Sequence, residues 1–330
     1  MTIIVDDTMF GDSPGVLDAW AVAGSQSIDL PAGSGIYFLF GDALVLADHA
    51  RGGDDHLTSM DSTRLYGDAE TITDFAQGGN DSVIVGSQGF EAYGDAVIMS
   101  GHGRGGDDYV EIAGAFSYYS GFAFGDAKIM TDHARGGNDQ VFGRGGPGTA
   151  VLYGDSDRME GHAHGGDDTL SAAPGVLVAY RGDAQNMAEY SVGGDDLLIA
   201  PVNEGGGVAE LVGDAYEMLD SSQGGHDRLV SAARSSEDMW GDAVYRWNDA
   251  VGGQDTFVFS VANGHDRILD FEPEKDRIEL DGFGFSGFED LAAHFQTTAG
   301  GVLISFSASD DILVRGVSVN SLTAEDFLFG

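Results

Sequence analysis

The stretch Gly165-Gly166-Asp167-Asp168-Thr169-Leu170 is one of eight copies of a pattern, Gly-Gly-x-Asp-x-apolar, in a chain of 330 residues. The other copies begin at Gly52, Gly78, Gly105, Gly136, Gly193, Gly224 and Gly252. The last acidic position never varies and holds Asp55, Asp81, Asp108, Asp139, Asp168, Asp196, Asp227 and Asp255. The apolar residues are Leu57, Val83, Val110, Val141, Leu170, Leu198, Leu229 and Phe257. Eight such copies predict a fold built by repeating one structural unit.

A second mark, Gly-Asp, lies eleven residues before every Gly-Gly. Its glycines are Gly41, Gly67, Gly94, Gly125, Gly154, Gly182, Gly213 and Gly241. The distance between successive marks varies from 26 to 31 residues. Constant spacing inside a variable period predicts one rigid segment and one variable loop per repeat, stacked as a solenoid.

Other columns of similar residues appear when the repeats are aligned on Gly-Asp. A small residue follows the aspartate in all eight copies, and a long apolar residue stands five positions after the glycine in seven, with Arg246 as the exception. An aromatic residue often precedes the glycine, as at Phe40, Tyr66 and Tyr153. Neighbouring strands place equivalent side chains about 4.8 Å apart, so these columns predict internal ladders. The short apolar runs between Gly and Asp favour strands and turns over helices.

The repeats divide the chain into three parts. Residues 1–40 are expected to form an N-terminal cap, because Gly11-Asp12 has no Gly-Gly at the proper distance. Residues 41–259 are the repeat solenoid, and residues 260–330 are expected to form a β-rich C-terminal cap. Asn263 to Ile268 is interpreted as a last degenerate copy, and 288–295 as a short helix.

Composition narrows the possible partners. Fifteen Lys and Arg against 55 Asp and Glu give a formal charge of −40, which opposes compaction and excludes nucleic acid as a partner. The absence of cysteine removes disulfides and thiolate chemistry. Met1–Asp7 lacks the basic and apolar regions of a secretory signal peptide, and no apolar stretch is long enough to span a bilayer.

The repeated aspartates point to calcium. Stacked carboxylates about 5 Å apart repel by roughly 1–3 kcal/mol per pair, and no Lys or Arg recurs at every turn. Calcium accepts carboxylate and carbonyl oxygens in flexible geometry, and glycines are expected to supply the backbone angles that aim carbonyls inward. The alternative is that these residues only form turns. The candidate ligands of about seven or eight ions are Gly53, Asp54, Asp55, Gly79, Asp81, Gly106, Asp107, Asp108, Gly137, Asn138, Asp139, Gly166, Asp167, Asp168, Gly194, Asp195, Asp196, Gly225, Asp227, Gly253, Asp255 and Asp266.

These turns resemble the calcium-binding nonapeptide of repeats-in-toxin (haemolysin-type) proteins, Gly-Gly-x-Gly-x-Asp-x-apolar-x. The resemblance covers about residues 41–266 and implies an all-β, parallel β-roll or β-helix solenoid with calcium-binding turns. It places Gly166 on the third glycine of the motif and Ala163 on the first, so the turn is altered. On the opposite edge the aspartate has become Ala150, and of the equivalent positions only Glu237 could still ligate. This predicts metal on one edge and a variable loop edge opposite, with aromatic residues at 115–119 and at Trp240.

Two further columns carry open alternatives. The Gly-Asp aspartates could supply a second row of ligands or could cap turn amides; they are Asp42, Asp68, Asp95, Asp126, Asp155, Asp183, Asp214 and Asp242. The partial column of His49, His102, His133 and His162 could bind zinc, but a solvated turn position is favoured because four copies lack it.

The C-terminal region, ending Glu325-Asp326-Phe327-Leu328-Phe329, resembles the end of serralysin-type exported proteins. That resemblance implies export through type I secretion machinery from a Gram-negative bacterium. Calcium would then act as a folding switch outside the cell. Sites with dissociation constants of about 0.1–1 mM, at tenfold higher calcium, would each contribute about 1.4 kcal/mol, or about 10 kcal/mol together.

No catalytic motif is present, so the chain is not expected to be an enzyme. The first hypothesis is a secreted calcium-binding protein with a structural, adhesive or surface-binding role towards surface or matrix polysaccharide or protein. The alternative is the calcium and secretion module of an extracellular protease, lipase or polysaccharide-modifying enzyme whose catalytic part is absent. A third hypothesis is an enzyme that acts on acidic polysaccharide.

Overall fold

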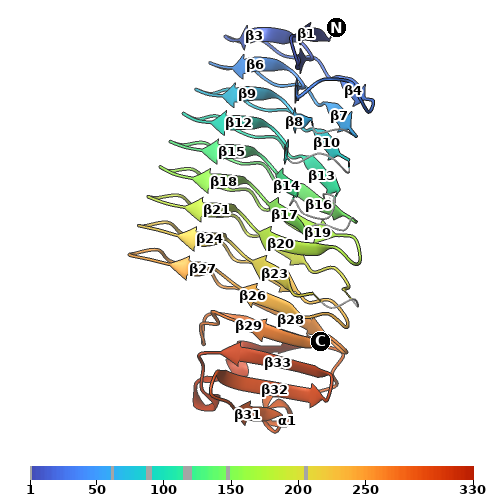
Figure 1. The fold of residues 1–330 in the computed structure, drawn as a ribbon. Coiled ribbons are helices and arrows are strands. Elements are labelled where there is room, and N and C mark those ends of the chain that lie inside the picture. The colour runs from blue at the N-terminus through green and yellow to red at the C-terminus, as the bar shows by residue number, and fades with distance from the viewer. Residues whose placement is uncertain (1, 61–62, 87–90, 114–120, 146–148, 204–206) are drawn as a thin grey trace.

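The computed structural model describes residues 2–60, 63–86, 91–113, 121–145, 149–203 and 207–330. The repeats form a parallel β-solenoid, as predicted, and each coil contributes one strand to each of three sheets (Figure 1). The coils follow one another along the stack in chain order, from the N-terminal end to a C-terminal cap. Equivalent residues of successive coils are in register, for example Val83, Val110 and Val141.

The first sheet has 14 strands in the described part of the chain. In sheet order they are β1 (Ile3–Val5), β2 (Thr8–Phe10), β5 (Phe38–Phe40), β8 (Arg64–Tyr66), β11 (Glu91–Tyr93), β14 (Gly121–Phe124), β17 (Thr149–Tyr153), β20 (Leu177–Arg181), β23 (Ala209–Val212), β26 (Glu237–Trp240), β29 (His265–Ile268), β33 (Asp310–Arg315), β32 (Gly301–Ser307) and β31 (Phe295–Thr297). Strands β2 to β33 in this order pair in parallel, whereas β1–β2, β33–β32 and β32–β31 are antiparallel.

The other two sheets are parallel throughout their described strands. The 9-stranded sheet contains β3 (Ser13–Leu17), β6 (Ala43–Leu46), β9 (Ala69–Ile72), β12 (Ala96–Met99), β15 (Ala127–Met130), β18 (Ser156–Met159), β21 (Ala184–Met187), β24 (Ala215–Met218) and β27 (Ala243–Arg246). The 11-stranded sheet contains β4 (Ser27–Leu30), β7 (His56–Ser59), β10 (Ser82–Val85), β13 (Tyr109–Ala113), β16 (Gln140–Arg144), β19 (Thr169–Ala172), β22 (Leu197–Ile199), β25 (Arg228–Val230), β28 (Thr256–Ser260), β30 (Arg277–Asp281) and β34 (Phe327–Phe329).

Within each coil, the three strands occur in a fixed order relative to the Gly-Asp and Gly-Gly-x-Asp motifs. The Gly-Asp mark joins a strand of the 14-stranded sheet to one of the 9-stranded sheet, and Gly-Gly-x-Asp precedes the strand of the 11-stranded sheet. Length differences fall in the segment that returns to the 14-stranded sheet, so the rigid and variable parts lie where the spacing predicted. The aromatic residues expected at 115–119 lie outside the described residues, and Trp240 is a half-buried residue of β26 rather than an exposed loop residue.

The predicted ladders form the core. The apolar column after Gly-Gly-x-Asp is fully or almost fully buried, and so are the methionines of the 9-stranded sheet, such as Met130 and Met159. The aromatic residues before Gly-Asp stack with ring centroids 4.7 to 5.4 Å apart between Phe10 and Tyr153. Burial of a large apolar side chain stabilises the fold by about 1.5–3 kcal/mol, so these columns hold neighbouring coils together.

The two ends of the stack differ from the repeats. Residues 8–30 form a coil with one strand in each sheet, and a β-bulge between Ser13 and Val16 adds one residue relative to Ala43–Val45. Gly11-Asp12 therefore belongs to the Gly-Asp column, contrary to expectation, because the bulge lengthens its distance to Gly24. At the other end, the 3-10 turns η1 (Val319–Ser321) and η2 (Ala324–Asp326) and the helix α1 (Phe288–Ala292) accompany the last strands.

Candidate metal-binding columns

The aspartates of Gly-Gly-x-Asp form a buried column along the solenoid. All eight are 1–3% exposed. The amide of each donates to Oδ1 of the equivalent aspartate in the next coil, as from Asp108 to Asp139 (2.7 Å) and from Asp139 to Asp168 (2.7 Å). The other oxygen, Oδ2, is buried without a hydrogen-bond partner in all eight. Repeated orphan acceptors of this kind indicate a missing donor or cation, because an unpaired buried polar group costs about 1–3 kcal/mol.

A glycine carbonyl oxygen lies beside each of these orphan oxygens in seven coils. A Cβ on Gly125 would stand 2.0 Å from Asp139 Oδ2 and 1.8 Å from the carbonyl oxygen of Gly154. The equivalent carboxylate and carbonyl oxygens lie similarly close to the corresponding glycine in six other coils, those of Gly41, Gly67, Gly94, Gly154, Gly182 and Gly213. Each of these coils therefore brings one carboxylate oxygen and one carbonyl oxygen into the space that a side chain would fill.

The glycines are required for close approach and not for left-handed backbone angles, so that part of the sequence interpretation is wrong. None of the glycines in the repeated marks has a positive φ. The second glycine of Gly-Gly packs against the preceding coil, and a Cβ on Gly137 would stand 1.4 Å from the carbonyl oxygen of Gly106. Any larger residue at these positions would push the coils apart.

The residue before each buried aspartate is exposed. These side chains form a second ladder on the surface, in which the amide of Asp167 donates to Asn138 Oδ1 (2.8 Å) and that of Asn138 to Asp107 Oδ1 (2.9 Å). Asp54, Asn80 and Asp195 occupy the same ladder. The structure thus separates the two acidic positions of the motif, with one facing solvent and one facing the interior.

The Gly-Asp aspartates form the second buried column. Seven are fully buried, and Asp242 is 3% exposed. Each caps the Gly-Gly of its own coil, as where Gly137 N donates to Asp126 Oδ1 (2.9 Å) and Gly166 N to Asp155 Oδ1 (2.8 Å). The prediction that these aspartates cap turn amides is therefore correct for one oxygen of each carboxylate. The other oxygen of Asp42, Asp126, Asp155, Asp183 and Asp214 has no partner.

Burial and mutual repulsion make both columns hard to ionise. Burial raises the pKa of Asp42 to about 7 and that of Asp55 to about 8. It also raises the pKa of Asp139 well above its usual range, and the charges of Asp126 and Asp168 raise it further. Two interacting rows of carboxylates without counter-charge would therefore bind protons near neutral pH.

Asp266 does not continue the first column, so the interpretation of Asn263 to Ile268 as a last copy of the turn is wrong. It lies in β29 of the 14-stranded sheet, where Glu237 N donates to Asp266 Oδ1 (2.9 Å). The column continues instead at Asp276, which accepts the amide of Asp255 (3.2 Å). Asp270 ends the Gly-Asp column, because its carboxylate accepts the amides of Gly241 and Asp242 in place of backbone carbonyls of a further coil. Neither residue follows a Gly-Gly or Gly mark, so the motif could not reveal them.

The histidine column is part of a longer exposed stack of rings. Trp20, His49, Phe75, His102, His133, His162 and Tyr190 stack in order, with centroids 4.3 to 5.3 Å apart. All seven are exposed, which agrees with the solvated turn position. The sequence alignment on histidine alone missed the three other aromatic members.

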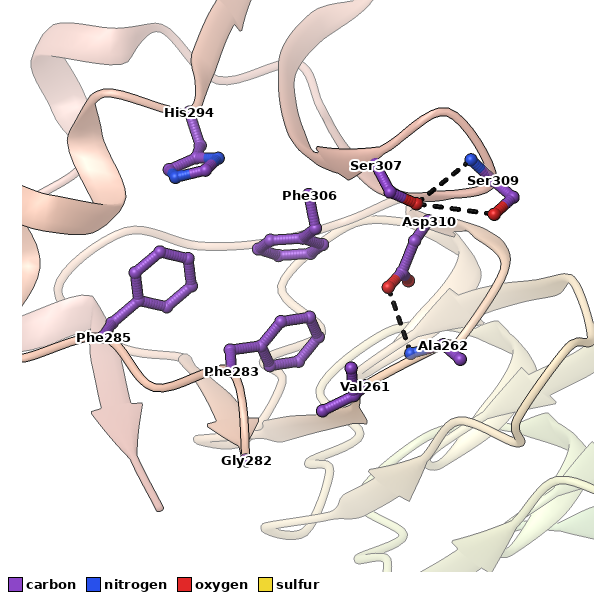
Figure 2. Close-up of a pocket in the computed structure, with 10 residues that line it drawn as sticks. All are labelled: Val261, Ala262, Gly282, Phe283, Phe285, His294, Phe306, Ser307, Ser309 and Asp310. Atoms are coloured by element: carbon purple, nitrogen blue, oxygen red, sulfur yellow. Dashed lines mark hydrogen bonds between the residues drawn. The ribbon is translucent and has the colours of Figure 1, made fainter.

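An open pocket of about 520 Å³ lies in the C-terminal cap (Figure 2). The rings of Phe283, Phe285, Phe306 and His294 gather on one side of it. His294 Nδ1 donates to the carbonyl of Ser305 (2.9 Å), and Asp310 accepts the amide of Ala262 (3.0 Å). These hydrogen bonds hold His294 and Asp310 against the backbone. Neither bond links His294 to a serine of the pocket, as a serine nucleophile activated by histidine would require.

The donor set of the columns limits what could bind there. Among the described residues, no group of three or more His, Asp or Glu side chains is arranged to hold a metal ion. A cation site in the columns would therefore use one or two carboxylates and backbone carbonyl oxygens such as those of the glycines. Such an all-oxygen set fits calcium and does not fit zinc, which prefers nitrogen and sulfur ligands.

Comparisons with known proteins add no assignment: no protein-family model matches the chain, and no curated protein or solved structure is significantly similar to it. In the part of the chain that the structure describes, no helix is long and apolar enough to cross a membrane.

Proposed function

We propose that this chain is a secreted calcium-binding solenoid that folds on calcium outside the cell and serves a structural, adhesive or surface-binding role. One observation carries the proposal. Eight equivalent aspartates each hold one buried oxygen without a partner, and in seven coils that oxygen faces the carbonyl oxygen of a glycine. A cation at each position would supply the missing partner of the carboxylate oxygen and could also bind the carbonyl oxygen.

The ligand chemistry favours calcium among the biological cations. Calcium accepts six to eight oxygen ligands in flexible geometry, whereas magnesium requires near-octahedral geometry and retains its waters. In the proposed sites, Asp139 Oδ2 and the Gly154 carbonyl would be two such ligands, and Asp168 Oδ2 with the Gly182 carbonyl the next. Eight ions would reduce the formal charge from −40 to about −24, which relieves the repulsion that opposes folding.

The energetic consequence is that folding would depend on the calcium concentration. If each site contributes about 1.4 kcal/mol at millimolar calcium, eight sites contribute about 11 kcal/mol, comparable with the whole stability of a domain. The chain would then be unfolded where calcium is scarce and folded where it is abundant. Export through a type I system, which the acidic and then apolar C-terminal segment supports by resemblance, would use the unfolded form.

The exposed aromatic surface supports a contact role. The exposed ring stack from Trp20 to Tyr190 gives the solenoid a continuous aromatic ridge about 30 Å long. Exposed aromatic side chains are common at contact surfaces because they bury much area at low entropic cost. The proposed partners are surface or matrix polysaccharides or proteins.

A calcium titration with matched variants tests the proposal. Far-UV circular dichroism in metal-free buffer at pH 7.5 would be followed to about 10 mM calcium, with magnesium as the control ion. Asp139→Asn removes one column carboxylate, and Asp132→Asn removes an exposed carboxylate of the same coil, which accepts the amide of Gly101 (3.1 Å).

We expect a cooperative rise in β signal with calcium alone, and a shift to higher calcium for Asp139→Asn but not for Asp132→Asn. A chain that is fully folded in metal-free buffer at this pH, or that responds equally to magnesium, contradicts the proposal. Equal behaviour of the two variants would show that the buried column is not the site.

A further inference from the structure

The buried Gly-Asp column has its own unpaired oxygens, separate from those of Gly-Gly-x-Asp. Around the first glycine of Gly-Gly, the carboxylates of two successive coils meet in five of the eight copies, those of Gly78, Gly105, Gly136, Gly165 and Gly193. A Cβ on Gly136 would stand 2.3 Å from Asp126 Oδ2 and 2.0 Å from Asp155 Oδ1. A Cβ on Gly165 would stand 2.2 Å from both Asp155 Oδ2 and Asp183 Oδ1. The Oδ2 atoms of these three aspartates are buried and without a hydrogen-bond partner.

These contacts place carboxylates next to each other with no donor between them. The nearest backbone donors, such as Gly137 N and Gly166 N, bind Oδ1 of their own coil and leave the facing Oδ2 unpaired. Among the described residues from Asp42 to Asp214, no Lys or Arg forms an ion pair with this column. Adjacent buried anions in this arrangement require a bridging cation or a shared proton.

The C-terminal end of the column shows how the chain supplies a counter-charge. The column that otherwise carries long apolar residues, such as Met218, changes to Arg246 in the last repeat. The guanidinium of Arg246 reaches Asp242 Oδ2 at 2.6 Å. Asp242, unlike Asp214, then has no unpaired buried oxygen. A side-chain cation thus stands at the one coil of the eight where the long apolar column is interrupted.

The geometry points to a second row of calcium sites in the Gly-Asp column, each ion bridging the carboxylates of two successive coils, with Arg246 replacing the ion at the C-terminal end. This inference rests on the proposed calcium-dependent fold and adds a separate set of ligands to it. The first row pairs a carboxylate with a glycine carbonyl, and the second pairs two carboxylates. Because the second row is fully buried, its ions would enter as the coils close.

Counting bound ions tests the inference. The calcium-saturated full chain would be dialysed to equilibrium at pH 7.5, and calcium per chain would be measured by mass spectrometry of the elements. Eight Gly-Gly-x-Asp aspartates allow about eight ions in the first row, so a second row predicts clearly more than eight. Asp155→Asn is expected to lose one or two ions, whereas the exposed Asp132→Asn keeps the wild-type number.

A gain-of-site variant avoids the ambiguity of a damaged fold. Arg246→Met restores the apolar residue of the column and removes the guanidinium that pairs with Asp242 Oδ2, leaving the charge of Lys275, which forms no ion pair with Asp242, so we expect one additional bound ion. An infrared band of protonated carboxyl groups that persists at saturating calcium would show shared protons instead and overturn the inference.

The two proposals fail differently. If Asp168→Asn loses an ion while Asp155→Asn and Arg246→Met keep the wild-type number, the second row is refuted and the calcium-dependent fold stands. If the wild-type chain binds no calcium, both proposals are refuted.

Discussion

Metal-free protein should become less stable as the pH rises from 5 to 8, which is opposite to the behaviour of a protein whose carboxylates are paired in the folded state. Burial raises the pKa of Asp42 and Asp183 to about 7, of Asp55 to about 8 and of Asp255 to about 9. In the unfolded chain these groups titrate near 3.8. Between these values the folded state binds more protons than the unfolded state, so raising the pH favours unfolding.

The size of the effect follows from the number of protons. Near pH 6 each of these four aspartates holds about one proton more when folded, which corresponds to a loss of about 5 kcal/mol of stability per pH unit. The twelve other column aspartates, whose pKa values are also raised, add to this loss. Since domains are stable by about 5–15 kcal/mol, one or two pH units should suffice to unfold the metal-free chain. Glu272 and Glu279 have lowered pKa values and act in the opposite sense, but only below about pH 4.5.

Urea unfolding followed by circular dichroism would measure this at several pH values, in metal-free buffer and in 10 mM calcium. We expect stability to fall with pH without metal. With calcium it should rise with pH, because protons compete with the ion for the same oxygens. The two curves therefore cross. Metal-free stability that is constant or increases between pH 5 and 8 would refute the view that the buried carboxylates lack a counter-charge.

Three further predictions concern the packing of the coils. Gly125→Ala places a Cβ within 2.0 Å of two oxygens and should destabilise the calcium-bound fold by about 3 kcal/mol or more in urea unfolding, whereas Gly145→Ala, with no atom within 4 Å, should change little. Leu170→Ala removes a fully buried side chain of the main core and should cost about 2–5 kcal/mol in the same measurement; a cost below 1 kcal/mol would show that this ladder does not support the fold. His133→Ala interrupts the exposed ring stack and should cost only about 1 kcal/mol while weakening any partner that binds the ridge, so unchanged affinity for a partner found on the solenoid would exclude the stack as its contact surface.

The repeated part of the fold could be predicted from the sequence because every repeat has the same residue types at the same spacing. Apolar residues such as Leu170 recur at a fixed distance from Gly-Gly-x-Asp, and stacking them in register buries all of them. The spacing also placed the variable segments correctly. The spacing did not reveal that each coil has three strands. Between Gly-Asp and Gly-Gly the chain forms both a strand and a tight turn, and one short apolar pattern covers the two.

The ends of the solenoid were not predictable from the motif, because register there depends on local irregularities. The bulge near Ser13 restores the alignment of Gly11-Asp12 with the column, although its spacing differs by one residue. In the C-terminal cap, Asp276 joins the column only 21 residues after Asp255, whereas successive repeats are 26 to 31 residues apart, and Asp266 enters another sheet. A short motif describes which residues are adjacent in the sequence. Membership of a column depends instead on which residues are adjacent in neighbouring coils.

The same distinction explains why two acidic positions that look alike in sequence should behave differently. Asp167 and Asp168 are adjacent, but alternation along an extended segment turns one side chain to solvent and the other inward. Only the inward carboxylate meets a buried set of oxygens, and only there is the cost of an unpaired charge high. A cation bound at the inward column would therefore be coupled to the closure of the coils, whereas ions near the outward ladder would exchange with solvent and contribute little. The folding switch should accordingly depend on the buried aspartates and be nearly indifferent to the exposed ones.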